Sequence, residues 1–214
     1  MELTVFKSLI AKLKENDLPA DNAHSLLAPP LRMKQLQKLD STKIKSKNAA
    51  VLLHLSPSFL GEMNFVLIQR NVYEGAHSGQ ISFPGGKPEI QDDSLWDTAL
   101  REAHEEVGLP PSRVEFVRAL SKLYVPPSNF LISPFVGLSY TPCDFKPDPT
   151  EVNAIIKISL KDLIEKQAVM TKQLASSLNE IEVPTYVFDD HQVWGATAMI
   201  LSEFKILLTT GLCK

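Results

Sequence analysis

The sequence predicts a mixed α/β fold of the α+β kind, because short strand-like runs alternate with helical stretches along most of the chain. Three observations support this: a clear amphipathic helix over residues 94–107, β-rich apolar runs on both sides of it, and a composition that permits a sizeable core. Of the 214 residues, 44% are hydrophobic and 22% are charged, which is typical of a folded globular chain. We therefore expect one main domain with additions at its ends.

Charge and cysteine content exclude several classes of protein. The net charge of −3 argues against a strongly basic nucleic-acid binder, so we expect no nucleic-acid partner. Cys143 and Cys213 lie far apart and neither belongs to a CxxC pair, so a disulfide framework or a structural zinc site is not expected. No stretch approaches the roughly 18 apolar residues of a membrane span, and we read no targeting signal at either end. These features predict a cytoplasmic protein without a membrane partner; a homodimer is left open.

The N-terminal part differs from the rest of the chain in its residue composition and in its hydrophobic pattern. Residues 6–14 place apolar side chains at helical spacing with lysines on the other side, which predicts a short amphipathic helix. Prolines at 19, 29 and 30 and a Lys- and Ser-rich run over 43–47 indicate a poorly regular segment after it. We therefore divide the chain into a helical and irregular elaboration, residues 1–47, and a main domain, residues 48–214.

The main domain begins with a predicted hairpin and continues to a helix. Apolar, β-rich runs at 50–55 and 64–69 flank a turn-like stretch. A glycine-punctuated loop over 74–86 leads to the helix at 94–107, where Trp96, Leu100, Ala103 and Val107 mark one buried face. Further strands are expected at 114–120, 130–140, 152–158 and 183–188, and helices at 160–166 and 196–209.

Three glutamates stand at helical spacing near the end of the 94–107 helix. Glu102, Glu105 and Glu106 occupy positions i, i+3 and i+4, which brings three carboxylates to one face of a helix that turns about 100° per residue. Like charges this close repel, so the arrangement favours a cation nearby, either a metal ion or Arg101. Carboxylate oxygens suit Mg²⁺ or Mn²⁺, and protein-bound Mg²⁺ is commonly shared with substrate phosphates. The alternative is an acidic helix face that is merely solvated.

A loop with two adjacent glycines precedes this helix. In Phe83-Pro84-Gly85-Gly86 the glycines let the backbone approach an anion or a metal without interference from a Cβ atom. Together with the glutamates, this loop indicates phosphate chemistry that depends on a divalent metal.

The segment Arg101-Glu-Ala-His-Glu-Glu-Val-Gly-Leu109 resembles the second half of the Nudix box. That signature reads Gly, five residues, Glu, seven residues, Arg-Glu-apolar-x-Glu-Glu-x-Gly-apolar, and the segment matches it at every fixed position. In the first half, Arg101 lies one position too far from Gly86, and Asp93 stands where the early Glu is expected. A one-residue insertion before the helix explains this. The resemblance implies a Nudix-type α/β/α sandwich with a mixed β-sheet.

The stretch before the box resembles the motif of the coenzyme A pyrophosphatase branch of this family. That motif reads Leu-Leu-Thr-x-Arg-Ser/Ala, three residues, Arg, three residues, Gly, three residues, Phe-Pro-Gly-Gly. Arg70, Gly79 and residues 83–86 match it in register, whereas Gly75 stands where the second Arg belongs. The change at Gly75 removes a guanidinium that could hold a phosphate through two hydrogen bonds.

The resemblance implies roles for individual residues. Glu102 and Glu106 would hold Mg²⁺ or Mn²⁺, and Glu105 would be a third ligand or the base that activates water, with Glu151 as the rival base. Arg101 would orient a glutamate through a charge-assisted hydrogen bond. Trp194 and Phe188 are expected to fill the core. The residues expected to bind substrate are Arg70, Gly79, Phe83, Gly85 and Gly86.

The function implied is hydrolysis of the pyrophosphate in coenzyme A or an acyl-CoA, which gives 4′-phosphopantetheine or its acyl form and adenosine 3′,5′-bisphosphate. The first alternative is a Nudix pyrophosphatase for ADP-ribose, NADH or another nucleoside diphosphate derivative, which the glycine at position 75 favours. The second alternative is a non-catalytic nucleotide-binding regulatory module, against which the intact glutamates argue. In each case the partner is a small nucleotide.

Overall fold

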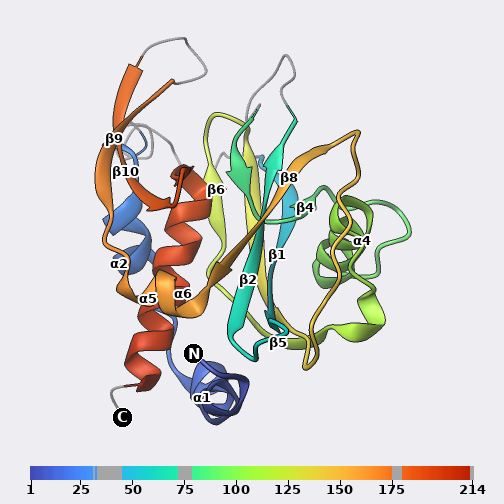
Figure 1. Ribbon diagram of the computed structural model, residues 1–214. Coiled ribbons are helices and arrows are strands. Elements are labelled where there is room, and N and C mark those ends of the chain that lie inside the picture. The colour runs from blue at the N-terminus through green and yellow to red at the C-terminus, as the bar shows by residue number, and fades with distance from the viewer. Residues whose placement is uncertain (31, 33–44, 72–78, 175–179, 213–214) are drawn as a thin grey trace.

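The computed structural model describes residues 1–30, 32, 45–71, 79–174 and 180–212. Within these residues an eight-stranded sheet forms the centre of the molecule (Figure 1). Its strands are β1 (Lys47–Pro57), β2 (Met63–Arg70), β3 (Ile81–Ser82), β4 (Gly85–Gly86), β5 (Glu115–Ala119), β6 (Leu123–Val125), β7 (Phe130–Leu138) and β8 (Val152–Ser159).

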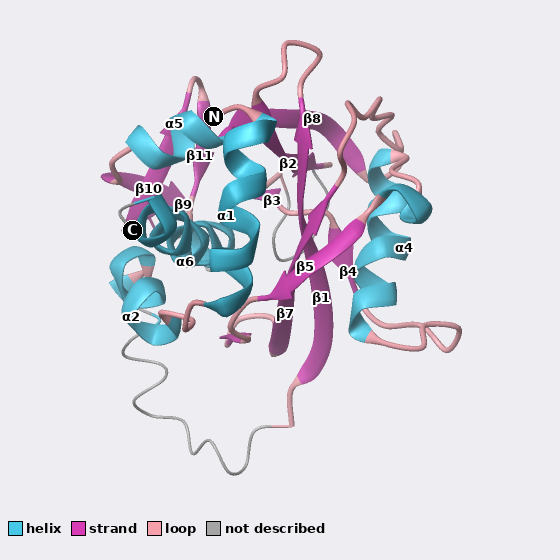
Figure 2. Cartoon of the chain, turned by 90° about the horizontal axis from the view of Figure 1, so that it is seen from below, coloured by secondary structure: helices cyan, strands magenta, loops and turns pink. Residues whose placement is uncertain are grey.

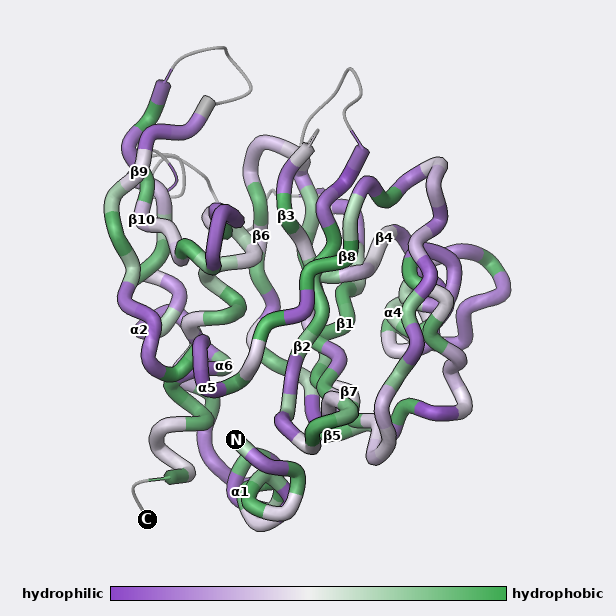
Figure 3. Tube along the Cα trace, viewed as in Figure 1, coloured by the Kyte–Doolittle hydropathy of each residue, from purple (hydrophilic) through white to green (hydrophobic). Residues whose placement is uncertain are grey.

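The sheet is mixed, as predicted. Strands β3, β2, β1, β7 and β5 lie in that order, while β4 pairs with β1, β6 with β7 and β8 with β2. β1 runs antiparallel to β2, with Leu55 opposite Phe65, which confirms the predicted hairpin. β1 runs parallel to β7 along the whole length of β7, from Lys47 opposite Phe130 to Leu55 opposite Leu138. β1 and β2 are mostly hydrophobic in Figure 3, as expected of strands covered on both faces.

Helices cover both faces of this sheet. The helix α4 (Leu95–Val107) packs on one face, and α1 (Leu3–Glu15), α2 (Ala20–His24) and α6 (Gly195–Leu212) lie on the other. Figure 2, seen from below, shows the sheet between these two helical layers. The predicted α/β/α arrangement is therefore confirmed. Shorter helical pieces are η1 (Ser25–Leu27), η3 (Pro111–Arg113) and α5 (Leu160–Glu165).

The helix α4 begins and ends where its capping residues require. The side chain of Ser94 accepts a hydrogen bond from the backbone N–H of Asp97, and Gly108 ends the helix in the left-handed conformation with φ 68°. Ala103 and Val107 are buried against β1 and β2, as predicted. Trp96 and Leu100 are only partly buried and lie at the edge of this cluster, because the shorter Ala99 occupies the position closest to the sheet.

The N-terminal part is more regular than the sequence indicated. The predicted helix is present as α1, and the expectation of an irregular segment after it was partly wrong, since α2 and η1 follow Pro19. Phe6, Leu13 and Leu27 belong to the same core cluster as α6, so these pieces are held by tertiary contacts that local patterns do not encode. Residues 33–44, which include part of the predicted connector, lie outside the described residues, and the division at residue 47 stays a prediction.

A second, antiparallel sheet stands beside the first. It consists of β9 (Val169–Leu174), β10 (Glu180–Phe188) and β11 (His191–Val193), and only part of β10 was predicted. β9 is missing from the sequence prediction because its apolar and polar residues do not alternate, and it gains its order by pairing with β10, where Val169 lies opposite Thr185. Among the described residues, no helix has the length and apolar character needed to cross a membrane.

Candidate active site

The two glycines of β4 lie against the glutamates of α4. The backbone N–H of Gly85 donates a hydrogen bond of 2.8 Å to Oε2 of Glu106. A Cβ atom on Gly86 would lie 2.3 Å from Oε1 of Glu102, which no real side chain tolerates. β4 is held there by antiparallel pairing with β1, where Val51 lies opposite Gly85. The absence of a side chain at Gly86 therefore lets the carboxylate of Glu102 approach the backbone. At Gly85 it lets β4 lie close to β1, because a Cβ atom there would lie 2.3 Å from the carbonyl oxygen of Ala50.

Glu106 is the most deeply buried carboxylate of this region. It is 1% exposed, and its partners are Gly85 and Arg70, whose Nη1 donates a hydrogen bond of 2.9 Å to Oε1. Burial raises the pKa of Glu106 to about 7, although the charge of Arg70 and the hydrogen bond from Gly85 act in the opposite direction. The carboxylate is therefore short of positive charge, and a further cation would stabilise its ionised form.

Glu102 and Glu151 add negative charge close to Glu106. Burial raises the pKa of Glu102, against the opposing charge of Arg101, and the charge of Glu151 raises the pKa of both Glu102 and Glu106. Glu151 itself is half-exposed, with Oε2 3.7 Å from Nη2 of Arg70. Arg70 therefore lies between Glu106 and Glu151 and offsets part of their repulsion.

Glu105 does not join this group. Its side chain is 55% exposed and its Oε2 accepts a hydrogen bond of 2.8 Å from Nη1 of Arg101, one helical turn earlier. In this structure Glu105 lies at the solvent edge of the helix while Glu106 faces the sheet, and the role of Glu105 as a third metal ligand or as the base stays a prediction. Among the described residues, no group of three His, Cys, Asp or Glu side chains is close enough to hold a metal ion.

Arg101 is held in place mainly by Asp92. Its Nε and Nη2 donate to the two carboxylate oxygens of Asp92 at 3.0 and 3.1 Å, and Nη2 also donates to the carbonyl of Lys87 at 2.8 Å. The hydrogen bonds from Arg101 lower the pKa of Asp92 to about 2. From this position Nη2 of Arg101 donates to Oε1 of Glu102 at 3.1 Å, which is the orienting hydrogen bond that the sequence predicted.

Asp92, and not Asp93, thus occupies the place of the early acidic residue. Asp92 follows Gly86 after the five intervening residues of the signature, whereas Asp93 precedes Arg101 by the seven intervening residues of the signature, and the contacts in the structure favour Asp92. Asp93 is exposed, while Asp92 also accepts hydrogen bonds from Thr98 and from the backbone of Glu89. The extra residue is therefore accommodated between Asp92 and Arg101.

Comparison with known proteins identifies the family. The NUDIX domain family matches residues 48–173, more than half of the chain. The chain belongs to the Nudix family. It is 30% identical over 162 residues to a Nudix hydrolase named NudL from Photorhabdus laumondii, covering 74% of this chain and 83% of that protein. It is 32% identical over 170 residues to "Nudix hydrolase 15, mitochondrial" from Arabidopsis thaliana, covering 76% of this chain and 59% of that protein.

A solved structure has the same fold. The Nudix hydrolase RenU from M. smegmatis superimposes with a TM-score of 0.54 at 15% identity, over 77% of this chain and 87% of that one. Family and relatives together make this Nudix protein a pyrophosphohydrolase, which excludes the non-catalytic module considered above.

The residues expected to bind substrate in this Nudix hydrolase lie in three different settings. Gly85 and Gly86 face the glutamates, and Arg70 is paired with Glu106 and Glu151. The side chain of Phe83 is 2% exposed and packs in the core, so this side chain is not placed to contact substrate. Gly79 has φ 66° and donates its N–H to the carbonyl of Asn71. Gly75 lies outside the described residues.

The donors at this Nudix site fit a hard divalent cation. Nudix hydrolases depend in general on divalent metals, and Glu102 and Glu106 supply two carboxylates beside a backbone stretch that has no side chains. Mg²⁺ is typically bound by one or two carboxylates together with waters and substrate phosphates. Burial raises the pKa of both glutamates, so a bound cation would stabilise their ionised forms.

Sequence reasoning missed two residues near this region. Asp92 could have been found by counting from Gly86. Trp194 was expected in the core, yet it is only half-buried and lines a pocket. Phe188, 4% exposed, fills the core as expected.

Proposed function

We propose that this Nudix hydrolase cleaves the pyrophosphate of coenzyme A or an acyl-CoA into 4′-phosphopantetheine, or its acyl form, and adenosine 3′,5′-bisphosphate. The observation that carries the proposal is the contact of Gly85 and Gly86 with Glu106 and Glu102 beside Arg70. These glycines and Arg70 belong to the same stretch that resembles the coenzyme A pyrophosphatase motif, so the resemblance extends to residues that meet in space.

In this proposal Glu102 and Glu106 hold Mg²⁺ or Mn²⁺. The metal, when bound, would supply positive charge for the pyrophosphate oxygens and for the charge that develops on them. Arg101, fixed by Asp92, keeps the carboxylate of Glu102 in one orientation. Arg70 balances the charge of Glu106 before substrate arrives. These residues therefore prepare the site before it binds substrate, which lowers the cost of reorganisation.

Glu151 is the general base that we propose. It is 55% exposed and so open to water, and it lies near enough to Glu102 and Glu106 to affect both electrostatically. Glu105, the other candidate, is held by Arg101 at the solvent edge of α4. Glu151 would take a proton from water as the water oxygen bonds to one phosphorus; the bond from that phosphorus to the bridging oxygen breaks, and the bridging oxygen leaves with the other phosphate.

The second candidate substrates are ADP-ribose, NADH and related nucleoside diphosphate derivatives. Position 75 favours them, because this chain has glycine where the coenzyme A motif has arginine. The two candidates differ in the adenosine 3′-phosphate, which coenzyme A carries and these compounds lack.

A substrate panel separates these candidates. Purified protein with Mg²⁺ or Mn²⁺ would be given coenzyme A, 3′-dephospho-coenzyme A, ADP-ribose and NADH, and the products would be separated by chromatography. We expect kcat/KM for coenzyme A to exceed that for the 3′-dephospho form by about tenfold or more, since a charge-assisted contact to phosphate contributes about 1.5–3 kcal/mol. Equal rates with and without the 3′-phosphate would favour the second candidate, and intact coenzyme A beside cleaved ADP-ribose would overturn the proposal.

A further inference from the structure

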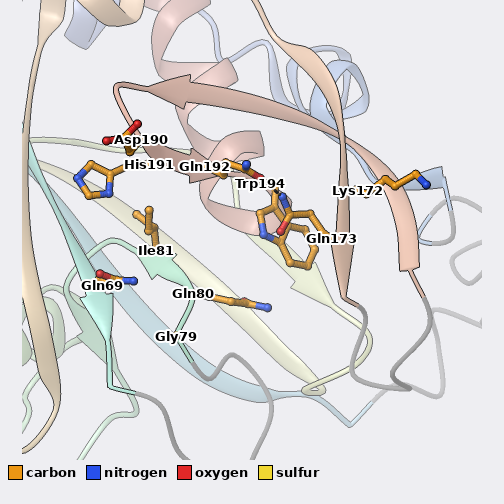
Figure 4. A pocket seen from close by; sticks show the side chains of 10 residues that line it. All are labelled: Gln69, Gly79, Gln80, Ile81, Lys172, Gln173, Asp190, His191, Gln192 and Trp194. Atoms are coloured by element: carbon orange, nitrogen blue, oxygen red, sulfur yellow. Dashed lines mark hydrogen bonds between the residues drawn. The ribbon is translucent and has the colours of Figure 1, made fainter.

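A pocket of about 480 Å³ lies between the two sheets, apart from the glutamates. One wall comes from the end of β2 and the start of β3, with Gln69 and Ile81, and the other from β9 and β11, with Gln173 and Gln192 (Figure 4). Trp194, just before α6, also lines the pocket and is drawn on the side of Gln173 and Gln192 in the same view. The volume falls within the range of about 300–1,000 Å³ that is usual for small-molecule sites.

Trp194 is held out of the core by the local backbone. Val193 before it is fully buried, and Gly195 after it adopts φ 63°, a conformation that side chains rarely permit. The indole is therefore half-buried and lines the pocket. A large aromatic side chain kept at a pocket by a glycine turn is suited to stacking.

The hydrogen-bonding groups of the pocket include the uncharged amides of Gln69, Gln173 and Gln192, which are held by neighbouring side chains. Nδ2 of Asn153 donates to Oε1 of Gln69 at 3.1 Å, which leaves the amide nitrogen of Gln69 as the end that can meet an acceptor. Nε2 of Gln173 donates both to the hydroxyl of Thr171 and to Oε1 of Gln192. The amide nitrogen of Gln192 is therefore likewise the end that can meet an acceptor. Amides fixed in this way match flat groups that carry ring acceptors.

The charge of the pocket does not suit a phosphate. Lys172 is exposed and forms an ion pair with Glu180 at 3.5 Å, and Asp190 adds a negative charge beside His191. Phosphate sites are typically built from arginines or from backbone N–H groups. A purine base is uncharged and planar; it stacks on an indole, and amide side chains can read its ring nitrogens and its amino group.

The pocket meets the catalytic face at the end of β2. Gln69 faces the pocket, and the next residue, Arg70, faces Glu106 on the other side of the strand. The pairing of β2 with β8 shifts register between Gln69 and Arg70, with Asn153 as the extra residue, and such bulges commonly redirect side chains beside active sites. A ligand whose phosphates lie at Arg70 therefore reaches the pocket around the end of one strand.

We propose that this pocket binds the purine base of the nucleotide substrate, stacked on Trp194 and contacted by the amides of Gln69 and Gln192. The proposal rests on the hydrolysis of a nucleoside diphosphate derivative proposed above, and it assigns the base half of that substrate to a place outside the glutamate cluster.

Binding of AMP tests the proposal without turnover. The chain has two tryptophans, so in the Trp96→Phe variant the fluorescence comes from Trp194 alone. We expect AMP to quench this fluorescence with saturation, and 4′-phosphopantetheine and inorganic phosphate to leave it unchanged. If Trp96→Phe does not fold, calorimetric titration of the unsubstituted protein with the same three compounds replaces it.

Substitutions in the pocket supply the second part of the test. Trp194→Ala should weaken AMP binding about tenfold, because stacking contributes about 1–3 kcal/mol per base. Trp194→Phe should restore most of the affinity for AMP. Gln192→Ala should weaken AMP binding. Gln167→Ala, on the exposed segment after α5, is the control and should leave AMP binding unchanged. Quenching by 4′-phosphopantetheine without quenching by AMP would overturn the proposal, as would AMP affinity unchanged in Trp194→Ala.

Failure of this proposal is distinguishable from failure of the proposed function. AMP binding at Trp194 together with intact coenzyme A in the hydrolysis assay would refute the substrate and leave the pocket assignment standing. Cleavage of coenzyme A with an unchanged KM in Trp194→Ala would refute the pocket and leave the substrate standing.

Discussion

Two buried glutamates on opposite sides of the sheet have opposite environments. Glu106 of α4 is 1% exposed and Glu203 of α6 is 0% exposed, so burial penalises the charge of both. In Glu106 burial prevails and raises the pKa to about 7. In Glu203 burial also acts to raise the pKa, but hydrogen bonds from His24 and Ser121 outweigh it and the pKa is lowered.

The difference comes from the number and the origin of the partners. Glu203 lies 3.1 Å from Nε2 of His24 and accepts from both the hydroxyl and the backbone N–H of Ser121, at 2.6 and 3.1 Å. These bonds tie α6 to α2 and to the loop after β5. Glu106 has Arg70 and one backbone N–H, with other carboxylates nearby. A carboxylate that the protein satisfies is structural, whereas one that it leaves short of positive charge is prepared for a ligand.

Glu106→Gln should give the largest effect on activity. If Glu106 holds the metal as proposed, its loss removes several kcal/mol of transition-state stabilisation, so kcat should fall about 1,000-fold. Glu203→Gln is the matched control and should keep kcat within about threefold in the folded protein. Steady-state kinetics with Mg²⁺ or Mn²⁺ checks both, and undiminished turnover in Glu106→Gln would remove the contrast between the two residues.

Glu203→Ala should give the largest loss of stability. It leaves His24 and the N–H of Ser121 without their buried partner, which costs about 3 kcal/mol in the free energy of unfolding. Urea denaturation followed by circular dichroism measures the change. Glu182→Ala, at an exposed position of β10, is the control and should change the free energy of unfolding by less than about 0.5 kcal/mol. A similar value for both variants would contradict the structural role of Glu203.

Gly86→Ala should reduce activity more than stability. The new Cβ would lie 2.3 Å from Oε1 of Glu102, the mobile end of a side chain, so the carboxylate can turn away with little cost to folding. We expect kcat/KM to fall by about 10- to 100-fold, the range seen when a metal ligand loses its orientation. Gly211→Ala, where the nearest side-chain atom is 3.7 Å away, should leave activity unchanged. A large loss of melting temperature in Gly86→Ala with full activity would be the opposite result.

Asp92→Asn should reduce kcat/KM about tenfold, because Arg101 loses the ion pair that positions it against Glu102. Asp93→Asn changes the neighbouring exposed carboxylate and should have little effect. The two variants measured in parallel decide which aspartate replaces the early Glu of the signature. Equal losses in both would show that the contacts of Asp92 are not what positions Arg101.

The two glutamates should also give pH dependences of opposite sign. The folded pKa of Glu106 is raised from 4.5 to about 7, so its contribution to the stability of the metal-free protein is largest below pH 4.5 and is lost as pH rises through about 7. The folded pKa of Glu203 is lowered, so its contribution is present above pH 4.5 and is lost as pH falls through the lowered pKa. Urea denaturation of the unsubstituted protein, Glu106→Gln and Glu203→Gln from about pH 2.5 to about pH 8 gives these differences, each of about 1 kcal/mol or more per unit of pKa shift. Slopes of the same sign would contradict the comparison.

Much of the catalytic region could be predicted from local spacing. Glu102 and Glu106 follow from helical positions, and Gly85 and Gly86 from a loop that needs close approach of the backbone; the structure brings these four together. Helical spacing alone does not show that Glu105 is hydrogen-bonded to Arg101 at the solvent edge of α4, so its role in the site stays a prediction.

Other features depend on partners from distant parts of the chain. The hydrogen bond between Arg70 and Glu106 joins residues 36 positions apart, and the one between His24 and Glu203 joins residues 179 apart. Trp194 was placed in the core because tryptophan is usually buried, and nothing in the neighbouring sequence indicated a pocket between β2 and β9.

The sequence by itself determined the family, the mixed α/β fold, the catalytic helix and the two glycines, because each depends on spacing along a short segment. The tertiary structure alone decided which aspartate holds Arg101, which buried glutamate is left short of positive charge, and that Trp194 borders a pocket. These outcomes depend on burial and on partners brought by folding, and a buried charge takes its pKa from that environment rather than from its neighbours in the chain.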